Sequence, residues 1–384
     1  MEAMQLLLEL IRVAVCGQEP TEALKQACTP EALEAAYSIG ADHDLAHLVG
    51  QGAAKLQLPD SKALQKCKKA AMEALVRKTR QEIAYQTACK ILEQGKIPFI
   101  PLKGSVLRRW YPEAWMRTSC DMDILVRETD IPGARDLLEK ANWRYLWRSS
   151  HDISLFSPEG VHLELHHTTL EDCVSQAGAA VMAGIWQDAK PLPGKQYHME
   201  ISDGLFYYYH MAHMAKHVLT GGCGIRSFLD VWILNHRVDF DSKARTDLLD
   251  RGGLTAFGKA AEKLAEIWFS GAPMDEMSKC FQAFICNGGT YGNLENQVNL
   301  NQAKKGSKLR FIWERIFLPY SFLKYSYPVL QKHKWLTPVF WVVRWFRLLF
   351  GGKLANSVAE LKKTTAVTAD MQKEACALLH YLEL

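Results

Sequence analysis

Residues 101–126, PLKGSVLRRWYPEAWMRTSCDMDILV, decide how the rest of the chain is interpreted. In this stretch Gly104 and Ser105 follow a short apolar run, and Asp121 and Asp123 flank one residue at the head of a second apolar run. A glycine lets the backbone approach a phosphate, and the amides at the start of a helix favour anions. The stretch therefore predicts a phosphate-binding turn followed by a metal-binding strand.

The two aspartates are expected to act together. Successive side chains of a strand point to opposite faces, so Asp121 and Asp123 share one face and Met122 lies behind them. Two carboxylates this close repel each other and need a cation, and oxygen ligands suit Mg²⁺ or Mn²⁺, which take further ligands from substrate phosphates. The alternative is a strand that ends in two solvated carboxylates, which is the commoner case for an isolated Asp-x-Asp pair.

A third carboxylate, Glu164, lies in the run HLELH, between His162 and His166. The alternation of a strand puts all three side chains on one face. We expect Glu164 to be the third metal ligand or the general base that accepts the proton of an attacking hydroxyl. The two histidines either bind metal or pack across strands beside Glu164.

Basic side chains flank these features. Lys103 directly precedes the turn and Arg117 precedes the strand, and both can neutralise phosphate charge. Arg226 and Asp230 are four residues apart in a predicted helix, a spacing that favours an ion pair within that helix. The basic residues between 77 and 80 could face a ligand, but a solvated helix face is the simpler interpretation.

Three histidines, His210, His213 and His217, share one face of a helix predicted from Asp203, as its N-cap, through Leu219. Zinc binding is one interpretation of this spacing. Histidines that line a core or a pocket are the simpler one, because no cysteine or acid stands at a suitable spacing.

The hydrophobic pattern predicts an α+β protein with a small mixed sheet. We expect an N-terminal helical region at 1–95, an α/β core at 96–200 and a C-terminal helical domain at 201–384. The core should contain short strands at 97–102, 121–126, 143–147, 153–157 and 161–167. A hairpin turn at 158–160 should bring Glu164 alongside the aspartates.

Other local signals refine this outline. Thr29 and Thr129 are predicted N-caps, each close to a proline in the first turn of its helix. The Ala-rich residues 174–189 are expected to be helical, and the polar residues 287–302 are expected to form a surface loop. The apolar segment 335–350 either covers the catalytic unit or lies on a membrane surface, the first being favoured.

Composition excludes several classes of protein. The net charge of +4 is too mild for the concentrated basic face that long nucleic acids require, so no such partner is expected. The ten cysteines form no Cys-x-x-Cys pair, which suits a reducing compartment. The start of the chain reads as an amphipathic helix rather than a signal peptide, and no apolar run reaches the length of about 18 residues typical of a membrane span. A cytoplasmic location is therefore expected.

The motifs together resemble a bacterial group of nucleotidyltransferases within the DNA polymerase β-like nucleotidyltransferase superfamily. The resemblance covers residues 90–235 and rests on these stretches: LKGSVL at 102–107, YP at 111–112, RTSCDMDILV at 117–126, ELH at 164–166, HMAHMAKH at 210–217 and GCGIRSFLD at 222–230.

The resemblance implies transfer of a nucleoside monophosphate from an NTP to an acceptor hydroxyl, with release of pyrophosphate. It also implies that Gly104 and Ser105 hold the triphosphate, and that the three carboxylates hold a pair of divalent cations, Mg²⁺ or Mn²⁺. Arg226 would face the nucleotide cleft and contact phosphate. The acceptor would be a small molecule, a protein or an RNA end.

Two other functions stay open at this point. The first is a nucleotide-binding or interaction module that keeps the fold without transfer, although such a module has no need of three clustered carboxylates. The second is a membrane-surface scaffold built on the segment 335–350.

Overall fold

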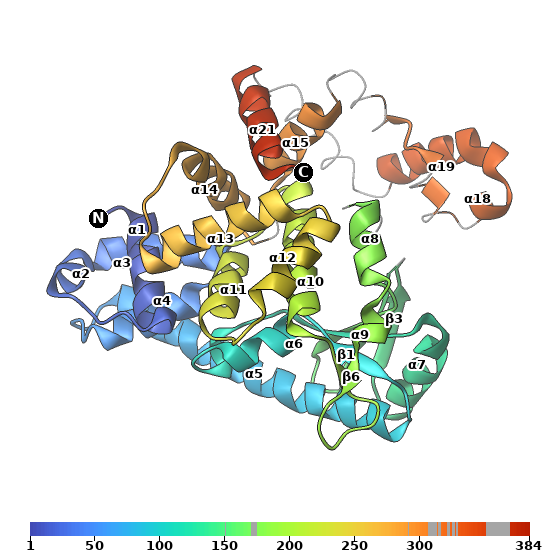
Figure 1. The fold of residues 1–384 in the computed structure, drawn as a ribbon, viewed down its shortest axis with the longest axis horizontal. Coiled ribbons are helices and arrows are strands. Elements are labelled where there is room, and N and C mark those ends of the chain that lie inside the picture. Colours follow the sequence, from blue (N-terminus) through green and yellow to red (C-terminus); the bar gives the residue numbers. More distant parts are fainter. Residues whose placement is uncertain are drawn as a thin grey trace. The chain divides into compact units, whose positions relative to one another are not determined.

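The computed structural model describes residues 1–149, 151–169, 175–290, 292–305, 313, 316–320, 323–324, 327, 329–350 and 369–384 (Figure 1). The chain divides into two compact units. The first comprises Met1–Lys216 and Gly224–Lys279, and the second comprises His217–Cys223 and Cys280–Leu384. All of the predicted site residues except His217 belong to the first unit. The division into three regions expected from the sequence stays a prediction.

The first unit contains a mixed five-stranded sheet. Its strands are β1 (Phe99–Pro101), β2 (Asp121–Val126), β3 (Arg144–Arg148), β4 (Asp152–Phe156) and β5 (His162–His166). They lie side by side in the order β1-β2-β5-β4-β3, with β2 parallel to β5 and the other neighbours antiparallel. Each strand lies within two residues of its predicted range, so the α+β fold with a small mixed sheet is confirmed.

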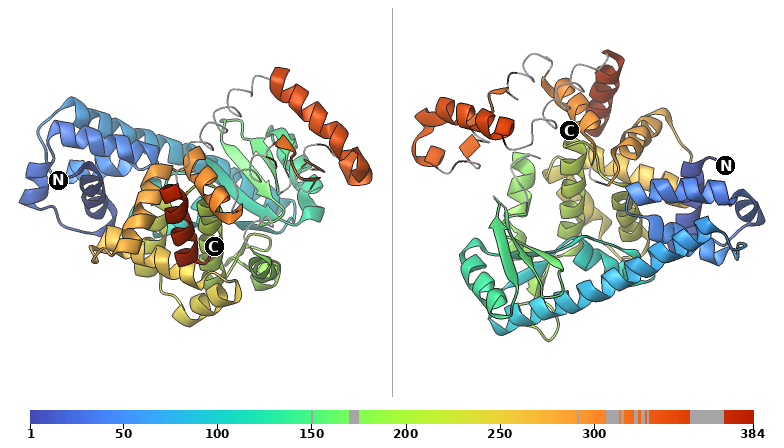
Figure 2. Two further views of the ribbon diagram at one scale, coloured as in Figure 1. Left: turned by 90° about the horizontal axis from the view of Figure 1, so that it is seen from above. Right: turned by 180° about the vertical axis from the view of Figure 1, so that it is seen from behind.

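Strand alternation gives the sheet one apolar face. Met122, Ile124 and Val126 of β2 are fully buried, and they join a core with Leu163 and Leu165 of β5. The long helix α5 (Lys62–Gln94) and the shorter α7 (Ile131–Lys140) complete this core. Figure 2 shows α5 running along the sheet. The opposite face is thereby left for the polar side chains of β2 and β5.

Local capping signals define the helices before the sheet. These helices are α1 (Ala3–Ile11), the π-helical turn Arg12–Cys16, α2 (Glu22–Ala27), α3 (Pro30–Asp42), α4 (Ala46–Lys55) and α5. The Thr29 hydroxyl accepts a hydrogen bond from the Ala32 amide at 3.2 Å, with Pro30 in the first turn, as predicted. The hydroxyl of Ser61 caps the 33-residue α5 in the same way.

Several short elements join or flank the strands. They are α6 (Gly104–Leu107), the 3₁₀ turns Arg108–Trp110, Ala114–Met116 and Glu128–Asp130, α8 (Gln176–Met182), α9 (Ile185–Asp188), and the small sheet of β6 (Lys190–Pro191) and β7 (Met199–Glu200). The helical structure predicted over 174–189 is present as α8 and α9, with a turn between them at Ala183 and Gly184, and residue 174 lies outside the described residues.

Two predicted N-caps are wrong. Thr129 lies inside the 3₁₀ turn Glu128–Asp130, and α7 begins after Asp130 without a capping side chain. Helix α10 (Asp203–Leu219) already includes Asp203, and the Ser202 hydroxyl caps it by accepting from the Leu205 amide at 3.4 Å. In both places the residue that precedes the helix is one position away from the predicted cap.

The remaining helices of the first unit follow α10. They are α11 (Ile225–His236), α12 (Ser242–Arg251) and α13 (Thr255–Ser270). The Arg12 side chain connects α13 to the start of the chain, because it donates hydrogen bonds to the carbonyls of Ile267 and Trp268.

The regular elements described in the second unit are helices. Its elements are the end of α14 (Glu276–Gly288), α15 (Leu294–Lys305), α18 (Val329–Lys332), the 3₁₀ turn Lys334–Leu336, α19 (Thr337–Phe350) and α21 (Ala369–Leu382). The surface loop predicted over 287–302 is therefore wrong. Leu300 packs against Ala375 and Leu379 of α21, and this burial stabilises a helix whose composition is polar.

The apolar segment 335–350 forms the 3₁₀ turn and α19, and it exposes Trp335, Val339 and Phe346. None of the described helices is both long and apolar enough to cross a membrane.

Candidate active site

The pairing of β2 with β5 assembles the predicted carboxylates. In this parallel pair Asp121 lies opposite His162, and Asp123 lies opposite Glu164. The hairpin expected to bring Glu164 into place does form, but it pairs Glu164 with Ser154 instead. The contact between Glu164 and the aspartates therefore comes from the parallel pairing of strands that are distant in the sequence.

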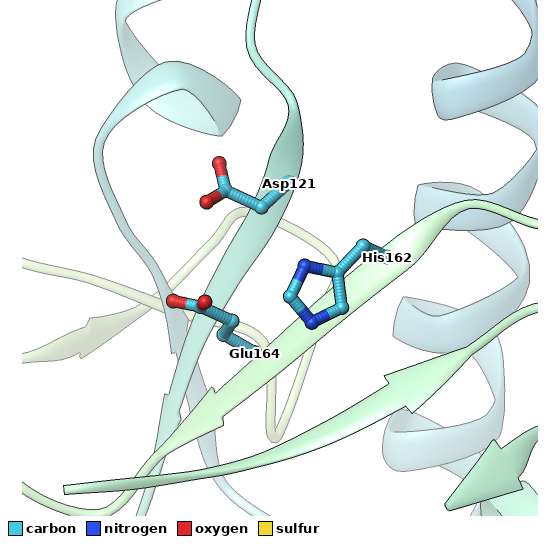
Figure 3. Close-up of side chains that lie close together, drawn as sticks. All are labelled: Asp121, His162 and Glu164. Carbon is cyan, nitrogen blue, oxygen red and sulfur yellow. The ribbon is translucent and has the colours of Figure 1, made fainter. Parts of the chain in front are cut away.

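The cluster offers two overlapping sets of metal ligands. Asp121, His162 and Glu164 have ligand atoms within 4.8 Å of one another, and so do Asp123, Glu164 and His166. Figure 3 shows the first set, with Asp121 on β2 facing the two residues of β5. Glu164 belongs to both sets.

Asp123 is the most buried carboxylate of the cluster, with 2% of its surface exposed. Its Oδ1 accepts from Lys103 Nζ at 2.6 Å and from His166 Nε2 at 2.8 Å. Burial alone would favour the neutral acid, but the Lys103 ammonium and the His166 bond outweigh it and hold the pKa of Asp123 well below its usual range. Burial opposes the charge of Lys103 as well, but Asp123 raises the pKa of the amine.

The pKa of Asp121 is shifted in the opposite direction, upwards. Burial raises the pKa of its carboxyl group, and the neighbouring Asp123 carboxylate adds to that rise. The described residues offer Asp121 no hydrogen bond to its side chain comparable to those that Asp123 receives. A divalent cation would relieve this unfavourable charge, because it favours the ionised form of each ligand.

His162 is held in one orientation by its neighbours on β4. Its Nε2 is 2.5 Å from the Ser154 hydroxyl, and its ring stacks on Phe156 with centroids 4.9 Å apart. The bond through Nε2 leaves Nδ1 as the nitrogen available to a cation. Metal-binding histidines commonly use their second nitrogen in this way.

The predicted phosphate-binding turn follows β1. Lys103 has a φ of 46° and precedes α6, and a Cβ on Gly104 would lie only 3.3 Å from Ser119 Cβ. The Ser105 amide donates to the Leu102 carbonyl at 3.2 Å, so among the described backbone amides of this turn the Gly104 amide lacks an acceptor. Ser105 lines a cavity of about 480 Å³ whose wall includes Trp110.

The two predicted phosphate-binding arginines are engaged with other residues. Arg117 Nε donates to Asp230 Oδ1 at 2.7 Å, and both residues are buried. Arg226 pairs with Asp44, so the ion pair within α11 that its spacing to Asp230 favours is not formed. The structure brings Lys103, Asp121, Asp123 and Glu164 together, while Arg117 and Arg226 join α11 to earlier parts of the chain.

The three histidines of α10 belong to neither set of potential metal ligands found among the described residues. His210 is buried, and its Nε2 lies 3.2 Å from the Ser227 carbonyl oxygen. Burial lowers its pKa. His213 stacks on Tyr209 with centroids 6.2 Å apart.

Tyr209 is a site residue that the sequence did not single out. It is buried on α10, and burial raises its pKa, with the charges of Lys103, Asp123 and Glu164 also acting on it. The run of three tyrosines at 207–209 draws attention to this helix, but only the packing of α10 decides which of the three is within reach of these charges.

Comparison with known proteins places the chain in a family. Residues 29–270 match a family described as "Uncharacterised nucleotidyltransferase". This match spans more than half of the chain, which therefore belongs to that family and is a transferase of nucleotidyl groups. The resemblance seen in the sequence is confirmed at this level.

One solved structure was also matched, a solution structure of the antibiotic-resistance factor ANT(2'')-Ia. The two chains are 9% identical, with a TM-score of 0.27, and the match covers 50% of this chain and 91% of that one. No curated protein matches the chain at a significant level.

Proposed function

We propose that this nucleotidyltransferase moves a nucleoside monophosphate from an NTP to an acceptor hydroxyl and releases pyrophosphate, with divalent cations held by Asp121, Asp123 and Glu164. The observation that carries the proposal is the pairing of β2 with β5, which gathers three carboxylates on one face of the sheet. In the reaction the acceptor oxygen bonds to the α-phosphorus, the bond from that phosphorus to the leaving pyrophosphate breaks, and the hydroxyl proton passes to a base.

The donor atoms fit Mg²⁺ or Mn²⁺. Carboxylate oxygens suit both ions, and an imidazole nitrogen in each set makes Mn²⁺ the better match of the two. When bound, such ions would neutralise phosphate charge and orient the attacking and leaving oxygens. Asp121 would belong to the site of one ion and Asp123 to that of the other, and Glu164 would contribute to both.

The chain's own groups have distinct roles in this proposal. Glu164 is the candidate base, because a quarter of its side chain is exposed while Asp123 is engaged by Lys103 and His166. The Gly104 amide and the Ser105 hydroxyl would hold phosphate oxygens, and Lys103 would supply positive charge.

The contact with phosphate expected for Arg117 and Arg226 stays a prediction, and each arginine would have to leave its carboxylate partner to make it. We assign both a positioning role, because their ion pairs connect the segment around Met116 and the loop at Asp44 to α11.

The test is pyrophosphate release from each of the four NTPs with Mg²⁺ or Mn²⁺, together with NTP binding measured by thermal shift. Asp121→Asn and Glu164→Gln should abolish release, because each removes a charged ligand and keeps the side-chain shape. Asp136→Asn, on the exposed side of α7 and outside both cavities, is the matched control and should behave as wild type. Unchanged release in Asp121→Asn would overturn the assignment of the site.

A further inference from the structure

A second feature of the first unit lies directly beside the carboxylate cluster. It is a cavity of about 700 Å³ between the first half of α5 and the hairpin of β4 and β5. Its wall includes His162, which is also a member of the ligand set with Asp121 and Glu164, and Cys120, the residue before Asp121. The volume is typical of sites for small molecules. A molecule bound here would reach the candidate active site without crossing any other element.

The strand order separates this cavity from the turn proposed to hold the phosphates. β2 has β1 on one side and β5 on the other. The turn at Gly104 follows β1, whereas the cavity lies against the β5 hairpin. The other cavity, the one lined by Ser105, has no member of the carboxylate cluster in its wall, so a molecule bound there would not lie directly against the cluster. Transfer between two substrates needs one on each side of the reacting atoms.

We propose that this cavity binds the acceptor, and that the acceptor is a small molecule with an anionic group and a free hydroxyl. The inference rests on the proposed function, since it places the second substrate of that reaction.

The wall of the cavity supports this class of ligand. Met72 and Val76 are 61% and 46% exposed, and with Phe156 they offer apolar surface to the body of a ligand. Arg80 also lines the cavity and forms no ion pair among the described residues, and Arg77 has only an exposed contact of 3.5 Å with Asp44. A guanidinium group of this kind binds carboxylate or phosphate groups through its fork of donors.

The same wall argues against a polynucleotide acceptor. Glu73 and Glu159 line the cavity with the two arginines, so its surface carries both signs of charge. A nucleic-acid strand needs a continuous basic surface, because contacts with its phosphates dominate the affinity. A small anionic acceptor needs only the one arginine that is free to pair with it.

The experiment measures pyrophosphate release by the full-length chain with its preferred NTP and Mn²⁺. The added acceptors are glycerol 3-phosphate, glucose 6-phosphate, myo-inositol phosphate and gluconate, each beside its uncharged counterpart, and a short RNA. The variants are Arg80→Glu, which reverses the charge on an exposed position, and Val76→Trp, which fills the cavity. Lys90→Glu, on an exposed turn of α5 outside the cavity, is the matched control.

We expect at least one anionic acceptor to stimulate release in the wild type and in Lys90→Glu. Arg80→Glu should raise the KM for that acceptor by roughly tenfold or more, as expected for loss of a charge-assisted hydrogen bond. Val76→Trp should remove the stimulation, and the KM for the NTP should stay unchanged in both variants.

The opposite results are equally specific. Stimulation by RNA alone, no stimulation by any anionic acceptor, or a stimulation that survives in both variants would overturn the acceptor site and leave the proposed function standing. A Val76→Trp variant that folds but no longer binds NTP would show that the cavity holds the nucleotide. Absence of metal-dependent NTP binding in the wild type would overturn the proposed function and this inference together.

Discussion

At the scale of single residues, the candidate site holds two neighbouring aspartates in opposite electrostatic states. Asp123 has an internal counter-charge in Lys103, and His166 donates to the same oxygen. Asp121 has the Asp123 carboxylate beside it, and its pKa is raised. We therefore expect the first cation to bind at the set formed by Asp121, His162 and Glu164, where no lysine has to be displaced.

Ser154 should control the affinity of that set. Its hydroxyl is 2.5 Å from His162 Nε2, so Ser154→Ala removes the group that orients the imidazole. The expected result is a loss of Mn²⁺ affinity on the order of tenfold or more, measured by calorimetric titration. Ser157→Ala is the control, because the Ser157 hydroxyl bonds to the Val161 amide in the hairpin and not to His162. Equal affinities in the two variants would contradict the role of Ser154.

His47 should make stability depend on pH. It is buried, its Nε2 donates to the Met116 carbonyl at 2.8 Å, and burial lowers its pKa from 6.5 to about 4. Because the pKa of His47 is lower in the folded state, protonation of the imidazole favours unfolding. The contribution of the neutral imidazole to the free energy of unfolding is therefore complete above pH 6.5 and is lost as the pH falls towards 4. The loss should reach about 3 kcal/mol.

The measurement is the free energy of unfolding in urea between pH 7 and pH 4. His47→Gln keeps a donor for the Met116 carbonyl but cannot be protonated, so its stability should fall less over this range than that of the wild type. Parallel curves for the two proteins would rule out His47 as the source of the dependence.

At the scale of elements, the N-terminal region depends on close packing of α4 against its neighbours. A Cβ on Gly50 would lie 2.3 Å from the Cys67 carbonyl oxygen of α5. Gly50→Ala must push the two helices apart, and we expect it to lower the free energy of unfolding by about 2 kcal/mol.

The matched control for Gly50 is Gly133→Ala in α7. There the nearest atom, Ile97 Cδ1, would be 3.7 Å from the new Cβ, an ordinary contact. Alanine at this helical position should leave stability unchanged or raise it by about 0.5 kcal/mol. Equal effects at the two positions, measured by urea unfolding, would contradict the packing argument.

At the scale of the whole chain, a buried polar contact connects segments that are far apart in the sequence. Asp230 of α11 accepts from Arg117 at 2.7 Å and from the Tyr111 hydroxyl at 2.8 Å. The segment 111–117 leads into β2, so this contact anchors the approach to the aspartates.

Asp230→Asn should be strongly destabilising. It leaves the Arg117 guanidinium buried without a counter-charge, and we expect a loss of about 3 kcal/mol in the free energy of unfolding. Asp239→Asn changes an exposed carboxylate nearby in the sequence and should alter stability by less than about 0.5 kcal/mol. A similar small effect for Asp230→Asn would show that the pair is not essential to the fold.

The structure explains why the local features of this chain could be predicted. Thr29 caps α3 as predicted, because the N-cap bond is made within four residues. The strand DMDILV could be located, and its aspartates assigned to one face, because alternation depends only on adjacent residues. The sequence by itself thus determined the positions of the strands, the cap of α3 and the face shared by Asp121 and Asp123.

Only the tertiary structure decided the rest, since those features depend on which distant segments are buried together. The parallel register that sets Glu164 beside Asp123 is one example. Two further examples are the ion pairs that Lys103 forms with Asp123 and that Arg117 forms with Asp230. A charged side chain can pair with any carboxylate that the fold brings near, so spacing along the chain favoured the wrong partner for Arg226. Burial of Leu300 likewise turned a polar segment into a helix, which composition alone does not predict.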